Sequence, residues 1–202
     1  MLPVLHSCTI EKMSMNEMSF LKDAAPNVAE RLLGCYIERD IDGQTLIARI
    51  VETEAYDATD AASHSFNGET KRTKVLFGPA GYLYVYFTYG MHYCCNVVVG
   101  EEGYGAAVLI RAIEPINGTV YMESRRGKTG VLATNGPAKV CQAMAINLSD
   151  NGDNLRTGSV RLIEQPPIEK TNITVTPRIG ISKAKDTPWR FCITDNPYVS
   201  RR

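Results

Sequence analysis

The sequence lacks the motifs that accompany metal and nucleotide-cofactor chemistry. Its 202 residues include three histidines, and none of its six cysteines belongs to a Cys-x-x-Cys pair. Zinc ligands usually come in such closely spaced pairs, so this composition predicts no metal site. There is also no phosphate-binding loop, no dinucleotide-binding glycine fingerprint and no His-Glu-x-x-His motif, so we expect no cofactor. Cysteines scattered in this way are typical of free thiols in a reducing compartment.

Long apolar runs are also missing. No run approaches the roughly 20 residues that cross a bilayer, and residues 1–8 have no basic stretch before their short apolar piece, unlike a secretion signal. We therefore expect no membrane partner and no secretion, with the protein in the cytoplasm of a bacterium or the nucleus of a eukaryote. Hydrophobic residues make up 44% of the chain, enough for a sizeable core. Residues 1–16 show no periodicity and are expected to be a loose lead-in to a single domain, 17–202.

A strong net charge is absent, because acidic and basic residues balance. Their placement is uneven: residues 1–120 carry an acidic excess, and residues 121–202 carry an equal basic excess. A basic half is the electrostatic footprint of a polyanionic partner, although charges also segregate by chance. The neutral total predicts modest non-specific affinity for nucleic acid, with fewer phosphate contacts than a strongly basic protein makes.

Short runs of alternating apolar residues, separated by turn residues, predict a sheet. The expected strands are 35–39, 45–53, 82–87, 92–99, 106–113, 159–163, 173–175 and 190–194. Asp42-Gly43 between the first two is a hairpin signal. Helices are expected after Asp23 as the N-cap residue, over the basic stretch 119–126 and over 137–146. The fold class is therefore α/β (α+β): one domain with a curved, mostly antiparallel sheet and short helices around it.

One strand carries an unusual set of tyrosines. Tyr82, Tyr84 and Tyr86 alternate with apolar residues, and Gly90 then permits a turn into a second apolar run. The pattern predicts a hairpin with an aromatic residue, Tyr89, at its tip. A tyrosine face packed in the core is the plain interpretation. Several flat rings on a rigid strand also suit a flat ligand such as a nucleobase.

Two carboxylates stand close together before a long polar stretch. Glu52 and Glu54 are two residues apart, so on a strand they share one face and repel each other. One can be structural and the other catalytic, because a strand that opens onto a polar loop, here 57–75, holds a base rigidly beside a pocket. The alternative is a solvated pair on an edge strand.

Three further polar residues are candidates for a site. Arg111 lies inside an apolar strand, where a charge must be paired or functional. His64 lies in a loop of small residues, where it either makes a surface hydrogen bond or stacks and accepts a proton. Its neighbouring serines lack the nucleophile elbow of a serine hydrolase. Asn96 is either a turn residue or a polar group that guards a pocket.

Six segments together resemble, in order and spacing, the alkyladenine (3-methylpurine) DNA glycosylase family. They are Ile50 to Tyr56, Ala62 to Ser65, Leu83 to Met91, Leu109 to Pro115, Gly136 to Ala143 and Pro177 to Gly180. The resemblance implies a monomeric enzyme whose partner is double-stranded DNA containing damaged purines. Its reaction hydrolyses the N-glycosidic bond of an alkylated or deaminated purine (3-methyladenine, hypoxanthine or an ethenoadenine-like base), which starts base excision repair. It implies no strand cleavage, no cofactor and no metal.

The resemblance also implies residue roles at the reacting bond. Glu54 matches the general base that activates water, and Arg111 matches the arginine that helps to hold that water. The backbone near Ile179 lies where the family adds a carbonyl group to the same water.

For the base itself, Tyr56, His64 and Tyr86 match the residues that sandwich a flipped purine. Asn96 matches the side chain that excludes the amino group of guanine. Tyr89 matches the wedge that fills the vacancy in the helix, as an aromatic residue on a tight turn can.

Phosphate contacts are expected from basic residues near these motifs: Lys71, Arg72, Lys74, Arg125, Arg126 and Lys139. The first three fall in a segment, 66–75, that matches the family poorly. Cys94 and Cys95 follow the hairpin, and they are expected to alter the size of the pocket.

Two other functions fit parts of the pattern. A non-catalytic nucleic-acid-binding module would use the same tyrosines and basic half, but it has little use for a buried carboxylate beside a water-holding arginine. A glycosidase for free nucleosides or sugars would show no preference for DNA.

Overall fold

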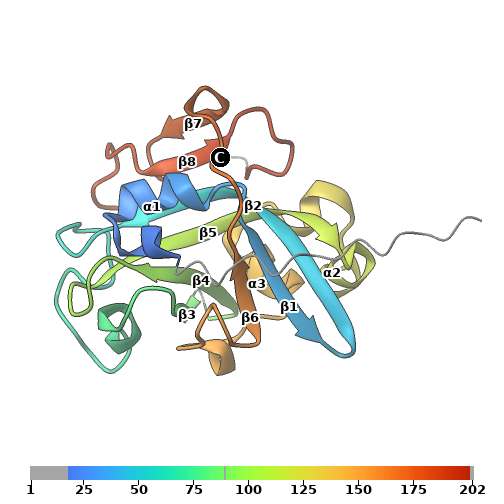
Figure 1. Cartoon of the computed structure of the whole chain (residues 1–202), viewed down its shortest axis with the longest axis horizontal. Coiled ribbons are helices and arrows are strands. Elements are labelled where there is room, and N and C mark those ends of the chain that lie inside the picture. Colours follow the sequence, from blue (N-terminus) through green and yellow to red (C-terminus); the bar gives the residue numbers. More distant parts are fainter. Residues whose placement is uncertain (1–17, 89, 201–202) are drawn as a thin grey trace, which may run out of the picture.

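A curled, antiparallel sheet of eight strands forms the frame of the protein, whose computed structural model describes residues 18–88 and 90–200 (Figure 1). Six strands follow the order β3-β4-β5-β2-β1-β6, and β8 pairs with β2 and β7. The strands are β1 (Tyr36–Ile41), β2 (Gln44–Tyr56), β3 (Leu83–Thr88), β4 (His92–Val99), β5 (Ala106–Asn117), β6 (Val160–Ile163), β7 (Ile173–Thr176) and β8 (Arg190–Ile193). The fold class predicted from the sequence is confirmed. The expected lead-in and Tyr89 lie outside the described residues.

Short helices pack on this sheet. The α-helices are α1 (Ala25–Leu32), α2 (Thr119–Arg126) and α3 (Pro137–Ala143), and the 3-10 turns are η1 (Ser19–Lys22), η2 (Lys74–Phe77), η3 (Gly130–Ala133), η4 (Leu148–Asp150) and η5 (Lys170–Asn172). Helix α1 packs against β2, and α3 packs against β4 and β5. Among the described residues, no helix combines the length and apolar character needed to cross a membrane.

Strand β2 is the centre of the sheet. Its first half pairs with β1, and from Glu52 to Glu54 it pairs with β5 on one side and β8 on the other. The pairing of β2 with β5 shifts register on both sides of Glu52, so the regular ladder is broken at this carboxylate. The carboxylates therefore do not lie on an edge strand, and neither Glu52 nor Glu54 has any exposed surface.

The period of two along β3, β4 and β5 separates two faces. One face belongs to the main core; its side chains include Leu83, Val85, Cys95, Val97, Val108 and Ile110. The other face carries Tyr84, Tyr86, Asn96, Ala107 and Leu109, all of which line a cavity. The long connection from β2 to β3 covers this second face, where Leu76 packs with Tyr84 and Ala107. Alternation along the strands thus directs apolar residues to the core and the tyrosines to the cavity.

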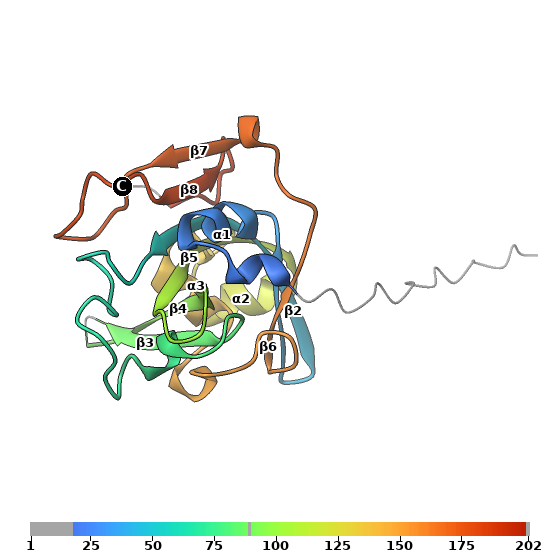
Figure 2. The same cartoon turned by 60° about the vertical axis from the view of Figure 1, so that its left-hand side comes forward.

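The β7–β8 pair lies on one side of the molecule and β3 and β4 on the other, with β2 and β5 between them (Figures 1 and 2). In both views, the loop after β2 and the connection from β7 to β8 project to the same side. Segments that are far apart in the sequence therefore reach one region of the surface.

Several local expectations from the sequence hold and two are wrong. The Asp42-Gly43 turn is present, and both residues have positive φ (53° and 72°), the conformation that suits a tight hairpin. Asp23 is not the N-cap of α1, because that position is Ala24; the Asp23 carboxylate instead accepts from the Ala24 N–H and the Asn27 amide. Helix α3 ends at Ala143, three residues earlier than expected.

Candidate active site

A cavity of about 370 Å³ opens on the tyrosine-bearing face of the sheet. Its lining contains six residues that the sequence identified as candidates: Tyr56, His64, Tyr86, Asn96, Arg111 and Ile179. They come from β2, the loop after it, β3, β4, β5 and the connection from β7 to β8. The volume falls within the range of small-molecule sites. The fold therefore assembles the candidate residues around one hollow.

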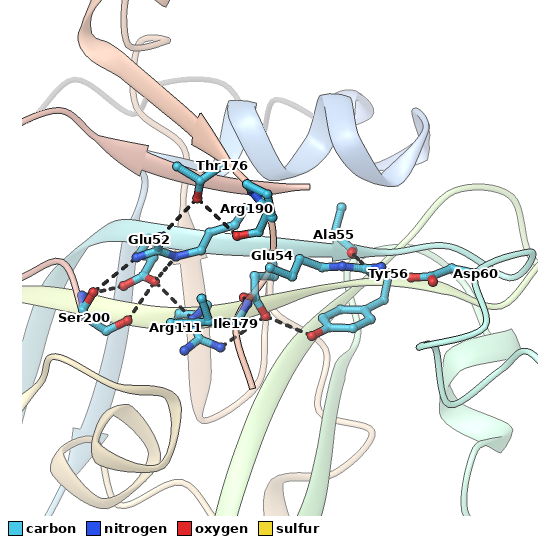
Figure 3. Close-up of polar contacts among 12 residues, drawn as sticks. Glu52, Glu54, Ala55, Tyr56, Asp60, Arg111, Thr176, Ile179, Arg190 and Ser200 are labelled. Carbon is cyan, nitrogen blue, oxygen red and sulfur yellow. Dashed lines mark hydrogen bonds and ion pairs between the residues drawn. The ribbon is translucent and has the colours of Figure 1, made fainter. Parts of the chain in front are cut away.

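Glu54 lies behind the wall of this cavity. Its Oε2 accepts hydrogen bonds from the Tyr56 hydroxyl at 2.8 Å and from a terminal nitrogen of Arg111 at 3.1 Å. Its Oε1 accepts from the backbone N–H of Ile179 at 2.9 Å (Figure 3). All three donors line the cavity, whereas Glu54 has no exposed surface. The carboxylate is thus held by hydrogen bonds from three directions.

Glu52 lies on the other side of Arg111, away from Tyr56 (Figure 3). Its Oε1 accepts from the Nε atoms of Arg111 (3.0 Å) and Arg190 (2.7 Å) and from the Ser200 hydroxyl (2.8 Å). Its Oε2 accepts from the Ser200 N–H at 2.6 Å. Arg111 therefore bridges the two carboxylates, which explains how Glu52 and Glu54 share a buried site despite their like charge.

The charges in this cluster also fix the protonation states of Arg111 and Tyr56. Burial alone would lower the pKa of Arg111, but the charges of Glu54 and Glu52 outweigh burial and raise the pKa. Burial and the Glu54 charge raise the pKa of Tyr56 far above its usual value, so its hydroxyl remains a donor at neutral pH. The cluster is therefore built to keep a carboxylate surrounded by donors.

Two rings form one wall of the cavity. The centroids of His64 and Tyr86 lie 4.5 Å apart at 75°, an edge-to-face pair. His64 Nδ1 lies 3.1 Å from the Tyr84 hydroxyl, and the Arg72 guanidinium lies 5.8 Å above the Tyr86 ring. Burial lowers the pKa of His64, and the charge of Arg72 lowers it further. A base stacked on both sides needs about 7 Å between rings, so it cannot enter between His64 and Tyr86.

Tyr56 is held by contacts that do not involve the His64–Tyr86 pair. The guanidinium of Arg178 lies 4.7 Å from the Tyr56 ring centroid and 5.4 Å from that of Trp189. Arg178 also donates to the Ala55 carbonyl at 2.8 Å and to the Asp60 carboxylate. This buried ion pair links the loop after β2 to the connection that carries Ile179, and it supports one face of Tyr56.

Asn96 and Cys94 line the cavity from β4. The Asn96 side-chain amide donates to the Tyr84 carbonyl at 3.2 Å, and only 5% of the residue is exposed, so its orientation is fixed. Burial raises the pKa of Cys94 to about 11, so it stays a neutral thiol near neutral pH. Cys94 thus lines the cavity, whereas Cys95 belongs to the core; their expected effect on the size of the pocket stays a prediction.

The basic candidates fall into three environments: exposed on a loop, paired with a carboxylate, or bound to neutral acceptors only. Lys71, Arg72 and Lys74 are exposed on the loop that covers the tyrosine face. Arg125 is paired with Asp42 at 2.7 Å.

Arg126 and Lys139 instead meet only neutral acceptors among the described residues. Arg126 donates to the Ala133 carbonyl and Gln142, and Lys139 donates to Asn135 at 2.6 Å. Partial burial lowers the pKa of Lys139, and the charge of Arg126 lowers it further. Two neighbouring cations without a carboxylate partner in the described chain favour an incoming anion.

Tyr89 lies outside the described residues, so its expected role is not tested. Its neighbours on the hairpin, Phe87 and Met91, expose 45% and 70% of their surface. The part of the hairpin that is described thus presents apolar side chains to solvent near the cavity.

Sequence reasoning gave no role to Arg178, Asp60, Arg190 or Ser200. Arg190 gave the same signal as Arg111, a charged residue within a short apolar strand, and it could have been found in that way. Arg178 lies in the segment Pro177 to Gly180, which resembles the family, but its neighbours in the sequence do not indicate its partners. Nothing in the sequence points to Ser200, because its partner Glu52 lies on a distant segment.

No group of three or more His, Cys, Asp or Glu side chains is placed to hold a metal ion within the described ranges. Among these residues, the five cysteines are buried free thiols.

Comparison with known proteins gives a consistent result. The sequence profile of the methylpurine-DNA glycosylase family matches residues 19–197. A protein of Carboxydothermus hydrogenoformans named "Putative 3-methyladenine DNA glycosylase" is 49% identical over 177 residues, covering 87% of this chain and 93% of that protein. Proteins with the same name from Francisella tularensis (48% identical, 87% and 93% covered) and Methanoculleus marisnigri (47% identical, 91% and 97% covered) are also similar.

Proposed function

The chain belongs to the methylpurine-DNA glycosylase family, hydrolases that cleave N-glycosyl bonds, and from this premise we propose the following reaction. The enzyme flips an alkylated or deaminated purine out of duplex DNA and hydrolyses its bond to deoxyribose with a water that Glu54 activates. Candidate substrates are 3-methyladenine, hypoxanthine and ethenoadenine-like bases. The product is an abasic site, the first intermediate of base excision repair.

The hydrogen bonds of Glu54 carry this proposal. A carboxylate offers about four acceptor positions. Among the described residues, Glu52 receives four donors, and the two residues besides Arg111 that supply them, Arg190 and Ser200, do not line the cavity. Glu54 receives three, which leaves one position on Oε1. All three donors of Glu54 line the cavity, whereas Glu52 lies on the far side of Arg111, so Glu54 is the carboxylate that is placed to take a proton from a water in the cavity.

The bond changes follow from this arrangement. The water oxygen forms a bond to C1′ of the sugar, one water proton passes to Glu54, and the C1′–N bond breaks with its electron pair going to the purine. An alkylated purine that carries positive charge leaves as a neutral molecule. A neutral purine such as hypoxanthine must gain a proton on the ring as it leaves. The carboxylate also stabilises the positive charge that develops on the sugar.

The aromatic residues supply the binding site for the base. The His64–Tyr86 pair acts as one wall, and the face of Tyr56 that Arg178 does not cover acts as the other. A stacked base gains roughly 1–3 kcal/mol from each aromatic contact, which offsets the few kcal/mol needed to unstack a base from the duplex. Tyr89, which lies between β3 and β4 in the sequence, fills the vacancy in the DNA helix.

Selection against normal guanine rests on Asn96. Its side chain is locked by the Tyr84 carbonyl, so it cannot turn away from a ligand that carries an extra amino group. A guanine amino group would then either clash or lose its hydrogen bonds.

Glu54 has no exposed surface, so the cavity wall must part before the carboxylate meets the sugar.

Phosphate contacts are assigned to Arg126 and Lys139, whose only acceptors in the described chain are neutral, and to the exposed Lys71, Arg72 and Lys74. Arg125 is paired with Asp42 at 2.7 Å, so we propose that it contributes less to phosphate binding than the others.

The test uses duplexes with one hypoxanthine or one 3-methyladenine at a defined position. The proposal predicts release of the free base and strand breakage only after treatment with alkali. Binding without base release would identify a non-catalytic nucleic-acid-binding module. Release from free nucleosides at the same rate as from duplex DNA would identify a nucleosidase instead.

A further inference from the structure

Glu52 is a buried carboxylate that the proposed reaction does not use. It receives four hydrogen bonds from three segments: Arg111 on β5, Arg190 on β8, and Ser200 (Figure 3). Arg190 in turn donates to the Thr176 hydroxyl at 3.1 Å and to the Ser200 carbonyl at 3.2 Å. Such a closed network holds its members in a single arrangement.

We propose that Glu52, anchored by Ser200 and Arg190, is a positioning residue that keeps Arg111 from occupying the last acceptor position of Glu54. The inference rests on the proposed function, because it concerns the base in that reaction.

The geometry of Arg111 supports the proposal. Its guanidinium is a planar fork that readily forms two parallel hydrogen bonds with one carboxylate. Here it forms only one with Glu54, through a terminal nitrogen, because its Nε is turned toward Glu52 at 3.0 Å. Without Glu52, the fork is free to turn and bind both oxygens of Glu54. The position on Oε1 that water requires would then be filled.

The anchoring of Glu52 also supports the proposal. A carboxylate that held only Arg111 could follow the arginine as it turned. Ser200 fixes both oxygens of Glu52, with its N–H at 2.6 Å and its hydroxyl at 2.8 Å, and Arg190 holds Oε1 from β8. Ser200 is 7% exposed, so water does not compete freely for these bonds.

A purely structural role makes a different prediction. Glu52 and Glu54 carry two negative charges, and Arg111 and Arg190 carry two positive ones. If Glu52 served only to balance the charge of Arg190, removing both charges together would restore the site. If Glu52 positions Arg111, the double variant remains slow, because nothing else holds the Arg111 Nε.

The experiment compares the full-length wild type with Glu52→Gln, Ser200→Ala and the charge-balanced double variant Glu52→Gln/Arg190→Gln. Glu114→Gln is the matched control, because Glu114 is also a strand glutamate bound to an arginine, Arg49, but lies outside the cavity lining. Single-turnover rates of hypoxanthine release, the Kd for the lesion duplex and the thermal midpoint are measured for each.

We expect Glu52→Gln and the double variant to release hypoxanthine about 10–100-fold more slowly than wild type, a loss like that caused at metal sites by removing a partner that orients a ligand side chain. Ser200→Ala should be a few-fold slower. The Kd for the lesion duplex should change by less than about threefold, because none of these residues touches the base.

Three results would overturn the inference: a Glu52→Gln rate within about twofold of wild type, recovery of the rate in the double variant, or a loss of binding as large as the loss of rate. If Glu52→Gln does not fold, the double variant and Ser200→Ala still decide the question. A wild-type protein that releases no base would refute the proposed function itself, so the two failures are distinguishable.

Discussion

Replacing Glu54 by Gln is the perturbation whose effect the structure specifies most fully. The amide has one oxygen where the carboxylate has two. If this oxygen faces the Tyr56 hydroxyl and Arg111, the amide NH₂ takes the place of Oε1 and meets the Ile179 N–H. The position that should take the water proton then holds a donor, which cannot accept it.

The substitution has two expected effects, one on the reaction rate and one on stability. Loss of a positioned base lowers the rate of a proton-transfer step by about 10²–10⁴, equivalent to about 3–5 kcal/mol in the barrier. One backbone donor left without an acceptor lowers stability by about 1–3 kcal/mol, or roughly 2–12 °C in the thermal midpoint for a domain of this size. Lesion DNA should still bind, because the aromatic walls and Asn96 are unchanged.

The assay is single-turnover release of hypoxanthine from a duplex with the enzyme in excess, followed by alkaline cleavage, alongside equilibrium binding and a melting curve. Glu114→Gln is the control, with an expected rate close to wild type. A Glu54→Gln rate within tenfold of wild type would refute the assignment of the base. An equal loss in Glu114→Gln would show that the effect is not specific to the site.

Four further predictions concern the exclusion of guanine, the wedge in the DNA helix, the phosphate contacts and the pH dependence of stability. Asn96→Ser should release guanine from normal DNA at a measurable rate while still acting on hypoxanthine; continued rejection of guanine would show that another group excludes it. Tyr89→Ser should weaken binding to a lesion duplex more than it slows release from a single-stranded lesion, and equal losses would contradict the wedge role. Lys139→Ala should reduce the slope of log K against log salt by about one, whereas Arg125→Ala should change it little; the reverse order would remove Lys139 from the phosphate group. Because the pKa of His64 is lowered in the folded protein, its contribution to stability is present above the unfolded pKa of about 6.5 and is lost as the pH falls; denaturant melts between pH 7 and 5 should show a smaller decline for His64→Gln, and identical declines would contradict this.

Local patterns predicted the strands well, because the period of two reports which residues face a core. Along β3, the same period that directs Val85 inward places Tyr84 and Tyr86 together at the cavity. The two-residue spacing of Glu52 and Glu54 likewise predicted a shared environment. It did not show that β2 is central, since strand order is decided by contacts between distant segments.

The contacts that hold the site residues in place could not be predicted from the sequence, because they too join distant segments. Arg178 reaches Asp60 and the Tyr56 ring only because the connection from β7 to β8 folds over the end of β2. Asp23 shows why a local signal can mislead. It is a good N-cap residue just before α1, yet Ala24 is the N-cap and the Asp23 carboxylate binds the Asn27 amide instead. Patterns identify residues with special chemistry, whereas packing decides which partners they meet.

The most direct test of the reaction is a crystal structure of the enzyme bound to a duplex with a non-hydrolysable lesion. The proposed mechanism predicts the lesion base between Tyr56 and the His64–Tyr86 pair, with a water within about 2.6–3.2 Å of Glu54 Oε1 and facing C1′ of the sugar. A base left in the helix, or a sugar whose C1′ faces no water held by Glu54, would contradict it.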